Sequence, residues 1–169
     1  MATGIFGKLP AHGDFVRRGL PDGFVSAWDA WLQAGIAEAR DALGDGFAAA
    51  WAAAPAWCFH LPAGACGPEA VAGVLVPSED LVGRLFPVTL ARVLSAGEGP
   101  PGATWYGALE AAARLPGQDA DGLLAAIADL PPGDDEPPGE GWWRLDGARW
   151  DWPALPPPAL FRVLAEGGA

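Results

Sequence analysis

The chain has 169 residues, a formal net charge of −11 and nine Trp residues. A domain of this length buries roughly 70% of the surface that its unfolded chain exposes, so it needs no disulfide or metal to fold. The negative charge excludes binding to nucleic acid and steady attachment to an anionic membrane, because both require a basic surface.

The first third of the chain predicts a strand, a loop and two helices. Residues 3–6 can begin a strand, and the Gly- and Pro-rich segment 7–21 is typical of an ordered loop. Apolar residues with a 3.6-residue period predict a long helix that begins at Asp22 and ends at Gly44. A short alanine-rich helix is expected over residues 47–54, before Pro55.

Three strands are predicted next. Residues 57–61 alternate, which places Trp57, Phe59 and Leu61 on one face. Residues 71–76 are continuously apolar, as in a sheet that is covered on both sides. Residues 85–94 predict a longer strand, and Pro87 within it favours an edge position or a bulge.

The last third predicts helices around 103–115 and 120–130 and a hairpin over 142–152. Asp146-Gly147 supplies the hairpin turn, and residues 159–166 form a terminal helix or strand. Between them, the Pro-, Gly- and acid-rich segment 131–141 cannot pack a core. It is either a solvated loop or an acidic docking loop for a basic partner. We expect one domain over residues 1–169.

No nucleotide or metal motif is complete. Leu9 follows Gly7-Lys8 where a P-loop needs Ser or Thr, and the Gly97–Gly102 motif contains two Pro that remove amides. Cys58, His60 and Cys66 lack a fourth ligand at the usual spacing, so we expect no metal. The two Cys are too few for a disulfide scaffold, and their redox state stays open. Ser78 is interpreted as a turn residue rather than a nucleophile.

Two polar groups of side chains remain as site candidates. They are Lys8, His12, Asp14, Arg17 and Arg18 in the first loop, and Ser78, Glu79, Asp80 and Arg84 in the turn after residue 76. One interpretation is a buried ion-pair net that pins the two loops together, for example Asp14 with Arg84. The other is a partner-binding edge with charged loops at one end of the sheet.

Four motifs together resemble the TagF family of type VI secretion accessory proteins. They are GIFGKLPAHGDFVRRGLP (4–21), WDAWLQ (28–33), PAWCF (55–59) and GVLVPSEDLVGRLFPVTL (73–90). The Trp142-Trp143 pair and the tail ending near Leu164 also fit, whereas residues 95–141 match loosely. The positions carried over are Lys8, Gly13, Asp14, Phe15, Pro77, Ser78, Asp80, Gly83, Arg84 and Pro87. Gly13 and Gly83 are expected in backbone turns, and Phe15 and Pro87 in packing.

The resemblance implies an α/β/α sandwich, with a central mixed sheet and helices on both faces. It also implies a cytoplasmic, non-catalytic repressor of type VI secretion that binds the forkhead-associated (Fha) scaffold protein. Because no cofactor motif is complete, we expect no cofactor. The absence of a signal peptide in the first ten residues agrees with a cytoplasmic location. Two alternatives remain: a small hydrolase or phosphatase that uses Asp14, Ser78, Asp80 and Arg84, and a structural subunit of the secretion apparatus. The binding surface and the oligomeric state stay open.

Overall fold

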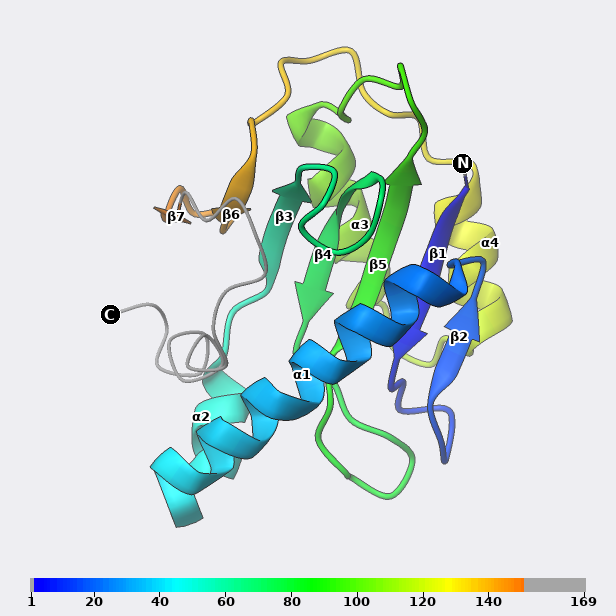
Figure 1. The fold of residues 1–169 in the computed structure, drawn as a ribbon. Helices are drawn as coiled ribbons and strands as arrows, with labels where there is room; N and C mark the ends of the chain where they lie inside the picture. The colour runs from blue at the N-terminus through cyan, green and yellow to red at the C-terminus, as the bar shows by residue number, and fades with distance from the viewer. Residues whose placement is uncertain (1, 151–169) are drawn as a thin grey trace.

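The computed structural model describes residues 2–150, and Figure 1 shows their arrangement. The sheet contains β1 (Thr3–Gly7), β2 (Val16–Arg18), β3 (Trp57–Leu61), β4 (Ala70–Val76), β5 (Val88–Leu94), β6 (Gly141–Trp143) and β7 (Arg149–Trp150). The helices are α1 (Asp22–Leu43), the 3-10 turn η1 (Gly44–Gly46), α2 (Phe47–Ala53), α3 (Ala103–Ala113) and α4 (Ala120–Ala128). An α/β fold, as predicted, is therefore confirmed. No helix in this part of the chain combines the length and apolarity needed to cross a bilayer.

The seven strands form one sheet in the order β2-β1-β5-β4-β3-β6-β7. Every strand pairing within residues 2–150 is antiparallel, so the predicted mixed sheet is wrong. The continuous apolar run of β4 predicted a sheet that is covered on both sides. It arises here because β4 lies at the centre of the sheet, where both faces are buried.

The long helix has the predicted limits for local reasons. Pro21 precedes it with extended backbone, and Asp22 places a carboxylate in the first turn, where the helix dipole favours it. Gly44 ends it with φ 53°, and its amide donates to the carbonyl oxygen of Arg40. The preceding segment is not entirely a loop, because Val16–Arg18 forms β2 and pairs with β1.

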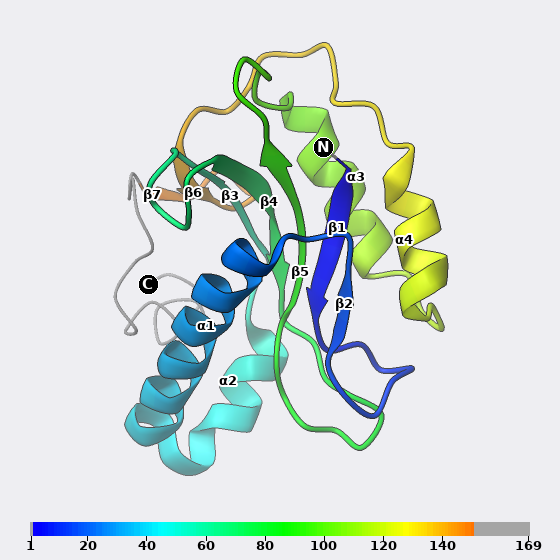
Figure 2. The same cartoon turned by 45° about the vertical axis from the view of Figure 1, so that its right-hand side comes forward.

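Two apolar clusters lie against the sheet. The first joins α1 and α2 to alternate residues of β3 and β5, and it contains Trp57, Phe59 and Leu61 as predicted. The second joins α3 and α4 to the intervening residues, among them Cys58. Figure 2 shows α1 and α2 on the opposite side of the sheet from α3 and α4. The alternation of a strand therefore decides which helix pair each side chain contacts.

Trp28 lies at the centre of the first cluster. Its side chain is fully buried, stacks on Phe24 at 5.2 Å between ring centroids, and contacts Phe59 at 4.7 Å. The indole Nε1 donates to Oγ1 of Thr89 on β5 at 2.8 Å, so the buried polar group of each partner is satisfied. This contact joins α1 to the middle of the sheet.

Pro87 does not interrupt a strand. The strand predicted over residues 85–94 begins at Val88, directly after the proline, and β5 lies between β1 and β4 rather than at an edge. The carbonyl oxygen of Pro87 accepts from the amide of Lys8 at 3.3 Å. A proline at this position costs no ladder bond because it precedes the strand.

The acidic segment 131–141 is mostly exposed, as expected of a solvated loop, but hydrogen bonds attach it to the start of α3. The carbonyl oxygen of Pro132 accepts from the amide of Gly102 at 2.7 Å. The Asp135 carboxylate accepts from the Thr104 amide at 3.0 Å and from its hydroxyl at 2.7 Å. It thereby satisfies a free donor in the first turn of α3. The predicted hairpin forms between β6 and β7 around Asp146-Gly147. Its last residues, 151–152, and the predicted terminal element over 159–166 lie outside the described residues.

We expect Trp28→Ala to lower the free energy of unfolding by about 3–5 kcal/mol, because it empties a packed core site. It also removes the donor to Thr89. Trp28→Phe, the matched variant, keeps an apolar ring and should cost clearly less. Chemical denaturation measures both. An unchanged stability of Trp28→Ala would contradict the assignment of this helix face to the core.

Candidate functional site

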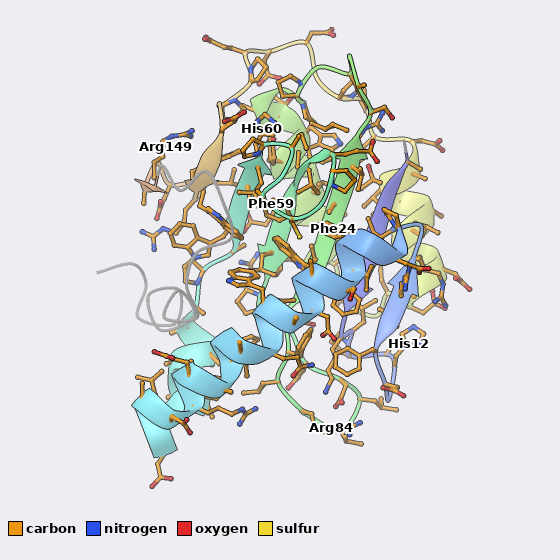
Figure 3. The ribbon with its side chains drawn as sticks, viewed as in Figure 1. His12, Phe24, Phe59, His60, Arg84 and Arg149 are labelled. Atoms are coloured by element: carbon orange, nitrogen blue, oxygen red, sulfur yellow. The ribbon has the colours of Figure 1, made fainter. Side chains whose placement is uncertain are left out.

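The two sequence motifs meet at one end of the sheet. β1 leads into residues 8–15, and β4 leads into residues 77–87, and we call these the first and second motif loops. Figure 3 shows His12 and Arg84 at this end and His60 toward the other. Residues about 70 positions apart in the chain are therefore neighbours, as the motif pattern predicted.

The carboxylate of Asp80 is the centre of the contact between the loops. Its side chain has no exposed surface, and four donors from two segments surround it. Oδ1 accepts from the amides of Val82 and Arg84 at 3.0 and 2.9 Å. Oδ2 lies 2.7 Å from Nε of Arg84 and 3.2 Å from Nζ of Lys8. A buried carboxylate with this many donors is fully compensated for lost hydration.

The surroundings of Asp80 also decide its ionisation. Burial alone raises the pKa of a carboxyl group, but hydrogen bonds from the Arg84 amide, Lys8, the Arg84 side chain and the Val82 amide outweigh it. Together they lower the pKa of Asp80 to about 2. The group is therefore a permanent anion near neutral pH. Its charge holds the second motif loop in place through hydrogen bonds to Val82 and Arg84.

Further hydrogen bonds tie the two motif loops together. The amide of Leu81 donates to the carbonyl oxygen of His12 at 2.8 Å, and Nη2 of Arg84 donates to that of Gly13 at 2.6 Å. The Ser78 hydroxyl donates to the carbonyl oxygen of Lys8 at 2.8 Å, rather than bonding nearby amides as predicted. The two loops are held together, as the ion-pair interpretation required, but most of the acceptors between them are backbone carbonyl oxygens.

The ion pair suggested between Asp14 and Arg84 is absent from the described structure. Arg84 is occupied by Asp80 and Gly13, and exposed Asp14 accepts from the amide of Phe15 at 2.7 Å. The sequence identified the charged residues but not their partners. The hydrogen bond between Asp14 and the Phe15 amide is local, so it forms within the turn and needs no distant partner.

The remaining cations of the first motif connect it to the helices. Arg17 pairs with Asp22 at the start of α1, and Nε of Arg18 lies 3.1 Å from Asp121 on α4. Nε2 of His12 accepts from the amide of Ala120, the first residue of α4, at 2.9 Å. Lys8, Arg17, Arg18 and Arg84 are each bound to a carboxylate. This end of the sheet is therefore not a free basic patch.

Two glycines make the loop geometry possible. A Cβ on Gly7 would lie 2.1 Å from the carbonyl oxygen of Pro87, so β1 could not approach the second motif loop with any other residue. Gly83 has φ 83° and closes the turn after Asp80, as predicted. Gly13 has open space around it and no positive φ, so the turn role predicted for it is not required.

The pinned loops expose large apolar side chains. Leu81 is 66% exposed and Val82 71% exposed, although the backbone of both is hydrogen-bonded. Phe15 is 43% exposed and packs against Phe86 at 4.9 Å, the packing role expected of it. Sequence reasoning passed over Leu81 and Val82. Two consecutive large apolar residues in an otherwise polar turn were the signal that could have identified them.

A groove of about 830 Å³ lies beside these loops at the same end of the sheet. Its walls come from the first motif (Leu9), from α2 (Trp51), from the second motif (Ser78 and Glu79) and from the connection between α3 and α4 (Leu115). The groove therefore crosses the end of the sheet from one helical layer to the other.

The candidate metal ligands do not converge. Cys58 belongs to the second apolar cluster and Cys66 to the first, on opposite sides of the sheet. No group of three or more His, Cys, Asp or Glu between residues 2 and 150 is placed to hold a metal ion. Burial lowers the pKa of His60, with the Glu140 charge and a Gly139 backbone hydrogen bond opposing. The ring therefore behaves as a core residue.

Comparison with known proteins places these features in a family context. The family model described as the TagF N-terminal domain, type VI secretion system-associated, matches residues 4–128. The crystal structure of PA0076 from Pseudomonas aeruginosa PAO1 superposes with a TM-score of 0.80 at 28% identity. The match covers 99% of this chain and 95% of that one. No curated protein matches the chain.

Acid should weaken the fold through Asp80. The folded pKa of about 2 lies below the value of about 3.9 for an unfolded aspartate, so the native state binds fewer protons between these values. The stabilisation is complete above about pH 4 and is lost as the pH falls toward 2. The difference in unfolding free energy between wild type and Asp80→Asn should therefore shrink over this range. A difference that stays constant with pH would contradict the assignment.

Both thiols should be inert in the folded protein. Burial raises the pKa of Cys58 to about 12, with a smaller contribution from Glu110, and burial raises the pKa of Cys66 to about 11. Because the thiolate is the reactive form, a disulfide reagent such as DTNB should react slowly with native protein. It should release two equivalents after denaturation, since both cysteines are free. Rapid native reaction at either thiol would contradict this burial.

Proposed function

Because the chain belongs to the family of TagF N-terminal domains of type VI secretion, we propose that it is a non-catalytic, post-translational repressor of that system. In this proposal it acts in the cytoplasm by binding the forkhead-associated scaffold protein. The observation that supports a binding role is the rigid display of Leu81 and Val82. Their backbone is held by Asp80 and His12 while their side chains stay exposed.

We infer that the helix pairs are the outer layers of an α/β/α sandwich, which leaves the strand ends as the surface open to a partner. A loop that is already ordered loses little conformational entropy when it binds. Exposed apolar side chains on an ordered loop are therefore suited to anchor a protein interface. Both motif loops lie at this end of the sheet.

A hydrolase built on the same residues has less support. The Ser78 hydroxyl donates to a backbone carbonyl oxygen, whereas an activated nucleophile donates to a general base. Asp80 is enclosed by four donors and has no surface from which to accept a substrate proton. The side chains of Asp14 and Arg84 each have another partner, the Phe15 amide for Asp14 and Asp80 for Arg84.

Secretion assays test the repressor role. Deleting the gene in a host with a silent type VI system should raise effector secretion, and wild type should restore silence. Val82→Asp should fail to restore it, because a charge replaces the exposed apolar contact. Leu145→Asp is the matched control, since Leu145 is also exposed but lies in the β6–β7 turn. No change in secretion on deletion would contradict the proposal.

The enzyme alternative has a separate test. Ser78→Ala removes the hydroxyl and one loop contact but leaves Asp80 and its donors in place. Repression should be retained by this variant at normal protein abundance. Hydrolysis of a model phosphomonoester or ester by purified wild type that Ser78→Ala abolishes would favour the hydrolase, whereas loss of repression alone would not, because Ser78 also lines the groove and ties the motif loops together.

A further inference from the structure

We propose that the groove at the strand ends receives a segment of the protein partner that carries an apolar anchor next to a cationic side chain. This inference rests on the proposed function and specifies the chemistry of the partner. The groove volume of about 830 Å³ falls in the range of pockets that enclose a ligand or an anchoring side-chain group.

Most of the exposed large apolar residues lie at the same end of the sheet as this groove. Among residues 2–150, five large apolar side chains are exposed: Phe15, Leu81, Val82, Leu115 and Leu145. Leu115 lines the groove, and the first three belong to the motif loops that border it. A soluble domain seldom gathers exposed apolar side chains at one end without a binding role. The clustering indicates an apolar anchor on the partner.

The groove is lined by small side chains and by one buried, hydrogen-bonded Trp. Ala48 and Ala52 on α2 and Ala112 on α3 line it with small side chains. Trp51 is buried beside them, and its Nε1 donates to the carbonyl oxygen of Ser78 at 3.0 Å. This bond ties α2 to the second motif loop. The groove is thus formed before a partner arrives.

The polar groups of the groove favour donors and cations. Two charged residues line it, and one of them, Arg114, pairs with Glu110 at 3.0 Å. The other, Glu79, is exposed, and no cation within residues 2–150 lies at ion-pair distance from it. A lysine or arginine of the partner would pair with Glu79.

The overall charge acts in the same direction. At −11, the chain attracts a basic segment over distances set by the ionic strength. The groove therefore fits a partner segment that has an apolar anchor and a basic side chain facing Glu79. It fits an acidic segment poorly, because Glu79 would be left against a like charge.

Binding of the purified full-length chain to the scaffold protein, measured by calorimetry at low and high salt, tests this site. Ala52→Trp fills the groove and should weaken binding at least about tenfold. Ala53→Trp is the matched control, because Ala53 is the next residue of the same helix, is exposed and does not line the groove. Leu115→Ser should also weaken binding. Leu145→Ser should not, although both leucines are 53% exposed.

The charge requirement is tested separately. Glu79→Lys should weaken binding and reduce its salt dependence, whereas Glu38→Lys, on the exposed face of α1, should change neither by more than about twofold. If Glu79→Lys leaves the affinity and its salt dependence unchanged, the proposed cationic side chain of the partner is overturned.

The outcomes separate this inference from the proposed function. If Ala52→Trp and Leu115→Ser bind the scaffold as tightly as wild type does, the groove is overturned as the binding site, but the proposed function stands. Wild type that does not bind the scaffold overturns both. A concentration-dependent dimer of wild type that Ala52→Trp abolishes would assign the groove to a second copy and overturn the inference. Circular dichroism shows in each case that the variant is folded.

Discussion

The arrangement of the motif loops depends on a single buried carboxylate. Asp80 has no exposed surface, so its charge has to be balanced by donors that the fold brings to it. Two of these are amides of its own loop, one is the Arg84 side chain, and one is Lys8 from the other motif. Removing any of them would leave a buried charge undercompensated. This requirement links residues 72 positions apart and holds the second loop in one conformation.

That conformation determines what the surface offers. With the Leu81 and Val82 backbone occupied, their side chains point to solvent, and Gly83 completes the turn with a positive φ. The same loop forms one wall of the groove through Ser78 and Glu79. The charged motif residues therefore act mainly as a scaffold within the protein. The surface available to a partner is apolar, with one uncompensated carboxylate on the groove wall.

The core supports this end of the sheet through aromatic packing. Trp28 links α1 to Thr89, next to the start of β5, and Trp51 links α2 to Ser78 directly. Both indoles satisfy their N–H groups while burying large apolar surfaces. The abundance of Trp therefore has a positional meaning. Trp28 and Trp51 transmit the positions of α1 and α2 to the strands and loops that carry the motifs.

The sequence by itself determined the elements whose causes are local. Periodicity and Gly44 predicted α1, alternation predicted the faces of β3, and Asp146-Gly147 predicted the hairpin turn. Its motifs also identified the residues of the site. Only the tertiary structure decided the antiparallel order of the strands, the central place of β5 and the pairing of Arg84 with Asp80 instead of Asp14. These depend on which distant segments meet. Charge and periodicity indicate that a residue requires an ion-pair partner or an apolar contact, whereas the three-dimensional packing decides which residue provides it.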